Sequence, residues 1–340
     1  MSQFNADHSE FAPISLVIPF NSEYESLYEI LSGVNGWIAK PSEINIISSN
    51  LLEEFQKNKF RDALNNANID LNLIEYPDSF PGKSRNLGVD ASKYEIIAFL
   101  DSKTLPLDNW LAEGYSKIKE NTFDIVWGQT YYEAKTFFEK ILRSATYGEI
   151  PLTTIPGSII YKRTFSKVGF FIERVRAGED GEWISRSQLL ELRSVKSFAV
   201  IKYIGLEGMR FLELVRKWFR NHLLSYSLPH LKIQRDIYFY FLAIVLLLVA
   251  YNWNNISYDE LLKGWDTSSW LYIPNVTKIS FALIAIPYFI LRALYIPIKK
   301  GVRVSYLLKG NFLPIFIISA LLDVVKVMAF TISKFIRARK

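Results

Sequence analysis

Three long apolar runs in the second half of the chain place the strongest limit on its fold. They cover residues 237–253, 279–298 and 312–332. About 20 mainly apolar residues, at ~1.5 Å of rise each, are long enough for a helix to cross a bilayer core. A helix buried in a soluble core is the alternative for any one run. The length of the first two runs and their flanking Tyr and Trp residues favour two membrane spans.

The third apolar run carries two charged residues, Asp323 and Lys326. A charge at the bilayer centre costs on the order of 2.5–3.5 kcal/mol even on lenient scales, although residues three apart on a helix can pair. We therefore expect residues 312–332 to be membrane-associated, in a re-entrant or interfacial position rather than as a third full crossing.

Charge is divided unevenly between the two halves. Residues 191–340 hold 21 Lys and Arg against 8 Asp and Glu, whereas residues 1–190 hold 19 against 26. A basic half can meet nucleic acid or an anionic membrane, and the apolar runs within it favour the membrane. We expect membrane lipid as a partner and no nucleic acid.

The positive-inside rule gives an orientation. Lys and Arg crowd the segments before the first run and after the second, but residues 252–278 contain only Lys263 and Lys278. This pattern predicts a multi-pass protein of the cell (cytoplasmic or inner) membrane with its first 235 residues in the cytoplasm. Residues 1–12 are polar, so we expect no signal peptide there.

The first half alternates short apolar runs with amphipathic stretches, which predicts an α/β fold with a Rossmann-like, mixed and mainly parallel sheet flanked by helices. The expected strands are 14–20, 44–47, 71–76, 96–100 and 123–127, and the expected helices are 22–31 (with Ser22 as N-cap), 51–66 and 84–92. The expected parts are a tail (1–12), a catalytic domain (13–205), an amphipathic interfacial helix region (206–235) and a membrane domain (236–340).

Composition excludes several chemistries. The chain has no cysteine, which removes disulfides, thiolate metal sites and cysteine nucleophiles. Three histidines disfavour a metal centre built from histidine. No GxGxxG motif follows the first expected strand, so a dinucleotide-binding oxidoreductase is also disfavoured.

Four segments together resemble a known family. They are VIPFNSE (17–23), GKSRNLGVDAS (82–92), IIAFLDSKTLP (96–106) and AGEDGEWISRSQ (177–188). In this order they resemble the family 2 glycosyltransferases of the GT-A fold, over about residues 13–190. The membrane half resembles members that act on lipid-linked or cell-envelope acceptors, as in polysaccharide biosynthesis. The resemblance implies a nucleotide-sugar donor and a lipid-linked or glycan acceptor; the oligomeric state stays open.

The resemblance implies that Asp101 is the first acid of the DxD motif, which contacts the ribose and the metal-bound diphosphate. Lys103 stands where the motif has its second acid, and a charged lysine cannot bind a metal. Three explanations are open. Lys103 itself neutralises the diphosphate, Mg²⁺ or Mn²⁺ is held loosely through Asp101 and the phosphates, or catalysis has been lost. The alternative for Asp101 is a turn or helix-capping residue.

Glu179 and Asp180 resemble the ED motif, whose Asp is the general base of an inverting transfer. The alternative is an acidic first helical turn. The acceptor side is expected to include Gly157, Ser158, Glu179, Trp183 and Arg186, where Trp183 stacks on a sugar or fills the core.

On the donor side the resemblance implies contacts from a set of residues near the first and third expected helices. This set is Pro19, Asn21, Glu23, Lys83, Arg85, Asn86, Asp101 and Lys103. A first-turn Glu and a solvated basic helix start are the alternatives for Glu23 and Lys83. The family often has a base-reading Asp after its second strand, but here Ser48 and Ser49 follow, so the nucleobase stays open.

Residues 216–218 (RKW) are similar to the end of the QxxRW motif of processive synthases, but Leu214 and Lys217 replace its Gln and Arg, and we expect no processivity. The main hypothesis is a membrane-anchored glycosyltransferase with Asp180 as base. The alternative is a degenerate, non-catalytic relative that binds a sugar nucleotide or a partner synthase.

Overall fold

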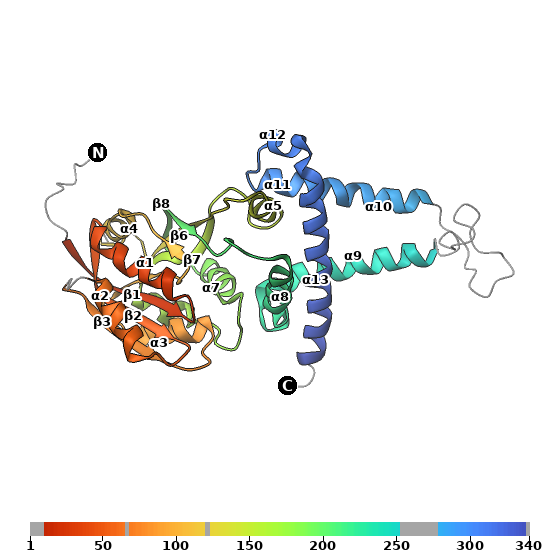
Figure 1. Cartoon of the computed structure of the whole chain (residues 1–340). Helices are drawn as coiled ribbons and strands as arrows, with labels where there is room; N and C mark the ends of the chain where they lie inside the picture. The colour runs from red at the N-terminus through yellow and green to blue at the C-terminus, as the bar shows by residue number, and fades with distance from the viewer. Residues whose placement is uncertain (1–9, 65–67, 120–122, 252–277, 338–340) are drawn as a thin grey trace.

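The computed structural model describes residues 10–64, 68–119, 123–251 and 278–337, and its α/β half is built on one eight-stranded sheet (Figure 1). The strands lie in the order β3-β2-β1-β4-β7-β6-β8-β5. Their bounds are β1 Glu10–Phe20, β2 Ala39–Ser48, β3 Asp70–Glu75, β4 Ile96–Phe99, β5 Thr104–Leu105, β6 Ile125–Tyr132, β7 Leu152–Tyr161 and β8 Ser194–Tyr203. Strands β1 to β4 pair in parallel, β7 is antiparallel to β4 and β6, and β8 runs parallel to β6. The predicted mixed, mainly parallel sheet is confirmed.

Helices cover both faces of this sheet. They are α1 Tyr24–Gly33, η1 Val34–Gly36, α2 Glu54–Ala63, α3 Pro81–Ala91, α4 Trp110–Lys119, α6 Lys162–Val168 and α7 Glu179–Gln188. Helix α5 Phe137–Ala145 lies away from these faces and packs on the C-terminal part of the chain. Alternate residues of β1 point to opposite faces, so Leu16 joins the core beneath α1, α2 and α4, and Val17 joins the core beneath α3, α6 and α7. The strand-end loops therefore meet at one edge of the sheet.

Some element boundaries differ from the expected ones. Strand β1 begins at Glu10, so the expected N-terminal tail overlaps the sheet, and β2 begins five residues earlier than its apolar run. Helix α1 is preceded by Glu23, and no side chain caps it, so the Ser22 cap was wrong. Strands β5 and β8 were not predicted. In β8 the apolar run is limited to residues 198–201 between polar residues, and it was not recognised as a strand.

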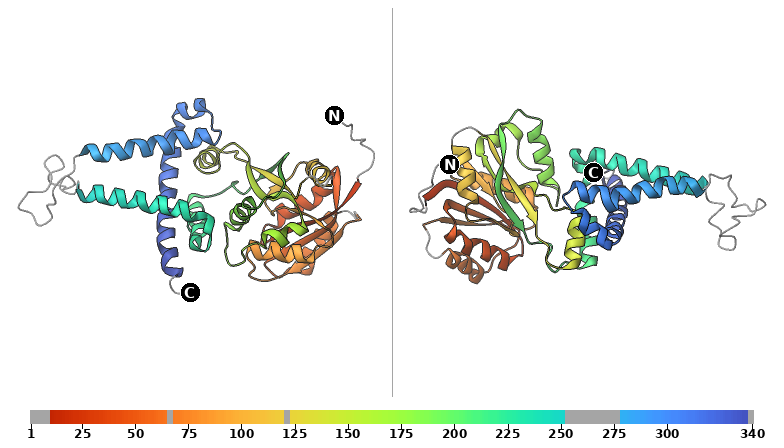
Figure 2. Two further views of the ribbon diagram at one scale, coloured as in Figure 1. Left: turned by 180° about the vertical axis from the view of Figure 1, so that it is seen from behind. Right: turned by 90° about the horizontal axis from the view of Figure 1, so that it is seen from above.

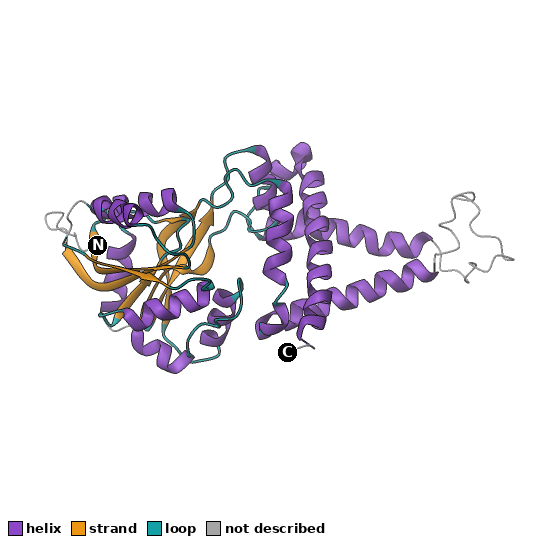
Figure 3. Ribbon diagram, turned by 60° about the horizontal axis from the view of Figure 1, so that its bottom comes forward, coloured by secondary structure: helices purple, strands orange, loops and turns teal. Residues whose placement is uncertain are grey.

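The C-terminal part is entirely helical in its described residues. It contains α8 Phe211–His222, η2 Ser225–Ser227, η3 Pro229–Leu231, α9 Lys232–Tyr251, α10 Lys278–Ile290, η5 Leu291–Tyr295, α11 Ile296–Lys299, α12 Val304–Tyr306, η6 Leu307–Asn311 and α13 Phe312–Arg337. Helices α9 and α10 run side by side away from the sheet, and α13 crosses their base next to the α/β half (Figures 1, 2 and 3). The end of the first expected span, at 252–253, lies outside the described residues.

Among the described residues, one helical stretch, Val304–Phe335, is long and apolar enough to cross a membrane. Gly310 has a φ of 91° inside it, so the straight helix α13 starts only at Phe312. The expected pair between Asp323 and Lys326 does not form. Asp323 is paired instead with Arg292, whose Nε lies 2.8 Å from its carboxylate.

The Asp323 carboxylate also joins three helices. It accepts hydrogen bonds from the Tyr238 hydroxyl of α9 at 2.6 Å and from the Tyr288 hydroxyl of α10 at 3.0 Å. A buried carboxylate needs such partners, because burying it without a partner costs on the order of several kcal/mol. This network is the physical reason why an apolar helix carries an acid.

Helix α8 packs between the sheet domain and α13. Leu214 of α8 is buried in a cluster with Leu142 of α5 and Leu322 of α13, while Phe211 at its start remains 39% exposed. The predicted amphipathic helix is therefore present, and its apolar face is covered by protein along much of its length. This packing holds the polar face of α8 over the edge of the sheet.

Candidate active site

A cavity of about 680 Å³ lies at the carboxyl ends of β1 and β4, between the start of α7 and helix α8. Ligands in open α/β sheets bind at this edge. Of the sequence-predicted site residues, the structure brings these to its lining: Pro19, Asn21, Glu23, Arg85, Asp101, Lys103, Glu179 and Asp180. The site thus combines residues from four separate stretches of the chain.

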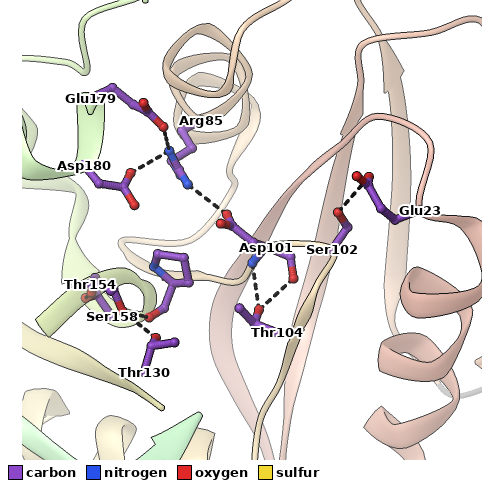
Figure 4. A network of polar contacts seen from close by, with 11 residues as sticks. Glu23, Arg85, Asp101, Ser102, Thr104, Thr130, Thr154, Ser158, Glu179 and Asp180 are labelled. Carbon is purple, nitrogen blue, oxygen red and sulfur yellow. Dashed lines mark hydrogen bonds and ion pairs between the residues drawn. The ribbon is translucent and has the colours of Figure 1, made fainter. Parts of the chain in front are cut away.

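One buried arginine connects three acids of the cavity (Figure 4). Arg85 of α3 is 2% exposed, and its Nη2 donates to Asp101 Oδ1 at 2.8 Å. Its Nη1 lies 2.7 Å from both Glu179 Oε1 and Asp180 Oδ1. The guanidinium fork suits this role because its planar donors can hold several carboxylates at fixed positions.

Electrostatics in this cluster favour a proton on Asp180. Burial raises the pKa of Asp180 to about 8; the Arg85 guanidinium opposes the rise, and the carboxylates of Glu179 and Asp101 add to it. The side chain still has 28% of its surface open to the cavity. A carboxylate with a pKa near neutrality that faces a cavity is suited to accept a proton from a bound ligand.

Asp101 is fixed by a tight turn directly after β4. Its backbone N–H donates to Thr104 Oγ1 at 2.9 Å, and the Thr104 hydroxyl donates to the Asp101 carbonyl at 2.7 Å. Ser102 of the same turn donates to Glu23 at 3.2 Å, which ties this loop to the loop after β1 (Figure 4). These hydrogen bonds hold the backbone of the turn, which presents the Asp101 side chain to the cavity.

Glu23 and Lys103 form an ion pair across the cavity wall, with Lys103 Nζ 3.2 Å from Glu23 Oε1. Burial raises the pKa of Glu23, but the Ser22 amide and the Lys103 ammonium outweigh this, and the pKa lies below its usual value. In the described part of the chain, no group of three His, Asp or Glu residues could hold a metal ion. With Asp101 paired to Arg85 and Lys103 in place of an acid, these donors do not fit a protein-held divalent ion.

Glycine at position 178 lets α7 begin at the cavity. Gly178 has a φ of 91°, and a Cβ there would lie 2.6 Å from the Leu228 side chain. Only glycine meets both demands without strain. The helix then starts at Glu179, so both acids of the ED pair occupy its first turn.

Trp183 and Arg186 do not line the cavity, contrary to the acceptor-side expectation. Trp183 is fully buried, packs on Phe165 and Phe171, and donates from Nε1 to the Gly169 carbonyl at 2.8 Å. Arg186 pairs with Glu182 and donates to backbone carbonyls at the end of α6. Both side chains therefore hold α7 in place, because their positions on the helix face the core.

Four further predicted residues also lie outside the lining. Lys83 pairs with Glu173 at 3.2 Å, and Asn86 exchanges hydrogen bonds with the backbone of Phe171. Ser158 is buried within the sheet and donates to the Thr154 carbonyl, and the carbonyl of Gly157 accepts from Trp110. These residues fix the segments around the cavity.

Several lining residues were not predicted from the sequence. Asp78, which follows β3, has a φ of 60° and lies in the cavity wall near Ser49. Tyr132 and Tyr147 stack at 3.7 Å, and Tyr203 packs on Tyr132. The one usable signal was that Asp78 follows a parallel strand. The tyrosines gave none, because they come from β6, β8 and the segment after α5, which meet only in the folded chain.

Three unpredicted cations complete the lining: Arg176 before α7, and Lys217 and Arg220 of α8. Burial and, to a smaller extent, the charges of Lys103 and Arg220 together lower the pKa of Lys217 to about 8, and the opposing effect of Glu23 is smaller. A second cavity of about 440 Å³ adjoins this wall and shares Lys103, Lys217 and Arg220 with the first. The mouth of the site is thus strongly basic.

Residues 15–179 match the family model described as Glycosyl transferase family 2. The matched residues contain the second half of β1, Arg85, Asp101 and the first acid of the ED pair. This part of the chain is therefore similar to the family 2 glycosyltransferases, in agreement with the resemblance that the sequence motifs indicated.

Particular proteins are similar to parts of the chain, which spans less than two thirds of the curated relative's length. Glycosyltransferase AglE of Haloferax volcanii is 23% identical over 188 residues, which span 51% of this chain and 60% of that protein. The crystal structure of S. aureus TarS 1-349 in complex with UDP-GlcNAc has a TM-score of 0.43 and 16% identity, and the match covers 62% of this chain and 67% of that one. The crystal structure of GalNAc-T7 with UDP, GalNAc and Mn²⁺ has a TM-score of 0.44 and 16% identity, over 56% of this chain and 44% of that one.

Proposed function

We propose that the protein is a membrane-anchored inverting glycosyltransferase. It moves a sugar from a nucleotide-sugar donor to a lipid-linked or cell-envelope acceptor at the cytoplasmic face. One observation carries the proposal: Asp101 and Asp180, 79 positions apart, are held by the same Arg85 at the wall of a single cavity. The cavity, at about 680 Å³, has the size of ligand sites that accept molecules of this class.

In this mechanism Asp180 is the general base. Its carboxylate takes the proton of the acceptor hydroxyl while the hydroxyl oxygen attacks the anomeric carbon from the face opposite the diphosphate. Asp101 and Lys103 act at the donor, where Asp101 orients the nucleotide and Lys103 faces the leaving diphosphate. Arg85 positions Asp101, Glu179 and Asp180 relative to one another.

A divalent ion such as Mg²⁺ or Mn²⁺, when present, would bring positive charge to the phosphates. Asp101 is the one candidate ligand from the motif, and one of its oxygens is already used by Arg85. The described residues give no fitting donor set, so no step in this mechanism is assigned to a metal.

Membrane anchoring is supported by the surface of the helical part. Large apolar side chains stand exposed along α9 and α10, including Ile237 at 61%, Leu246 at 57% and Ile286 at 58%. Such a contiguous apolar surface is unfavourable in water and fits a bilayer. With α9 and α10 as the two spans, α13 lies at the interface, and the basic flanks place the catalytic domain in the cytoplasm.

The test is a screen for nucleoside diphosphate release. Full-length protein is incubated with a panel of nucleotide sugars and a lipid extract, with and without EDTA. The account predicts release from at least one donor, and at least a hundredfold loss in Asp180→Asn, since a general base contributes about 10²–10⁴-fold. Asp90→Asn, an exposed acid on α3, is the matched control and should release at the wild-type rate.

The replacement of an acid by Lys103 also favours a second candidate, a non-catalytic relative that binds a sugar nucleotide or a partner synthase. In that case nucleotide sugars bind, but no donor, metal or lipid acceptor supports turnover. Turnover at the wild-type rate by Asp180→Asn would instead remove Asp180 as the base.

A further inference from the structure

Three cations at the cavity mouth have no anionic partner in the described part of the chain. No carboxylate lies within ion-pair distance of Arg176, Lys217 or Arg220 there, although 16 other such pairs form. Lys217 makes only a long hydrogen bond, 3.5 Å, to the Tyr203 hydroxyl. Lys217 is partly buried, whereas Arg176 and Arg220 are exposed at the rim of the cavity. A partly buried ammonium without a counter-ion is unfavourable, which indicates that an anionic ligand completes the wall around Lys217.

The arrangement of these cations fits one extended anion. Lys217 and Arg220 are three residues apart on α8 and so share a face of the helix. Lys103 approaches the same wall from the turn after β4, and these three side chains line both cavities. The donor of the proposed reaction carries a diphosphate, whose charge grows as it leaves.

The acids of the site are already engaged. Asp101 is held by Arg85, and Glu23 by Lys103 and Ser102. A divalent ion would need free oxygen ligands and would meet the Lys103 ammonium where the motif usually has an acid. The donor set thus disfavours a metal at this point and favours protein cations.

We propose that Lys217 and Arg220 of α8, together with Lys103, bind the diphosphate of the donor and do the work of a divalent cation. The inference rests on the proposed function. As the acceptor oxygen bonds to the anomeric carbon, the bond from that carbon to the diphosphate oxygen breaks. The electron pair stays on the diphosphate, where the three cations stabilise it, and the acceptor proton moves to Asp180.

A structural consequence follows for the whole chain. Helix α8 belongs to the C-terminal helical part and packs on α13 through Leu214 and Leu322. The membrane-proximal part of the protein therefore supplies groups that the catalytic reaction needs. The sheet domain alone would have an open, less basic donor site.

The test uses inorganic pyrophosphate as the probe, because the nucleobase is unknown. Calorimetric titration of the full-length protein in detergent should show pyrophosphate binding in the presence of EDTA. A second titration with Mg²⁺ in place of EDTA should give no higher affinity. Lys217→Ala and Arg220→Ala should each weaken it roughly ten- to hundredfold, the loss typical of one charge-assisted contact. Lys217→Arg keeps the charge and should restore most of the affinity.

Arg216→Ala is the matched control, because Arg216 is on the same helix but lines only the second cavity. It should bind pyrophosphate as the wild type does, and all variants should keep the wild-type thermal transition. Binding that appears only with Mg²⁺ or Mn²⁺, or alanine variants within twofold of the wild type, would overturn the inference. Donor turnover that EDTA abolishes would do the same while leaving the transferase function intact. Pyrophosphate binding in EDTA without turnover of any donor would contradict the proposed transferase function but support the proposed anion site.

Discussion

At the residue scale, one arginine and three acids form the centre of the proposed active site. Arg85 is buried among Asp101, Glu179 and Asp180, so the cluster carries more negative than positive charge around a single guanidinium. Coulombic attraction to these acids raises the pKa of Arg85 against the effect of burial, which keeps it charged at all relevant pH values. Burial raises the pKa of Asp180, and the surplus negative charge adds to this effect, so Asp180 can hold a proton near neutral pH.

The raised pKa of Asp180 predicts a pH dependence for turnover. A general base acts in its deprotonated form, so kcat at saturating donor should rise about tenfold per pH unit below the pKa and level off above about 8. The measurement is the rate of nucleoside diphosphate release from about pH 5.5 to about pH 9.5, a range that brackets the raised pKa. The residual rate of Asp180→Asn should be flat over the same range. A wild-type profile that is already level at pH 6 would contradict a raised pKa.

At the scale of elements, the first turn of α7 matters most. Gly178 allows the helix to start at the cavity, and Trp183, one turn further along, anchors it in the core. Arg186 then ties the other end of the helix to α6 through backbone carbonyls. The apolar packing of α7 and the ion pairs with Arg85 together hold the acids of its first turn in place.

This packing predicts a stability effect at Trp183 rather than an effect on acceptor binding. Trp183→Ala removes a fully buried indole and should cost about 3–5 kcal/mol of unfolding free energy. Thermal unfolding of the detergent-solubilised protein measures it. Leu189→Ala, at the end of the same helix and 82% exposed, should change the stability by less than about 0.5 kcal/mol. A Trp183→Ala protein that unfolds like the wild type but binds acceptor poorly would favour the sugar-stacking interpretation instead.

Much of this arrangement was predictable from local sequence. Short apolar runs predicted the strands β1, β3 and β4, and motif resemblance predicted that Arg85, Asp101 and Asp180 belong to one site. Trp183 shows the limit of that reasoning. An aromatic residue at helical spacing fits a core or a ligand site equally well, and only the packing against Phe165 and Phe171 distinguishes them.

Features that depend on long-range contacts could not be predicted. Lys217 gave a weak motif signal, but its place in the cavity depends on how α8 docks against α13. The tyrosine cluster needs β6, β8 and the segment after α5 to meet. Asp323 was noted as an intramembrane charge, yet its partner Arg292 lies 31 residues away, beyond helical spacing.

At the scale of the whole molecule, the site lies where two differently built halves meet. The sheet domain contributes the Arg85 cluster, and the helical part contributes the basic wall of α8. The α9–α10 pair extends away from the sheet on the far side of α13 (Figure 2). Under the proposed placement of α9 and α10 as membrane spans, the cavity is on the membrane-proximal side of the sheet domain, where the proposed lipid-linked acceptor would approach.

A double-mutant cycle shows whether Asp101 and Asp180 act together in one cleft, on which the proposed function depends. The measurement is kcat/KM for nucleoside diphosphate release by the wild type, Asp101→Asn, Asp180→Asn and the double variant. Residues of one network are coupled by about 0.5–3 kcal/mol, so the loss in the double variant should be clearly smaller than the product of the two single losses. A double variant whose loss equals the product of the two single losses would contradict a shared site.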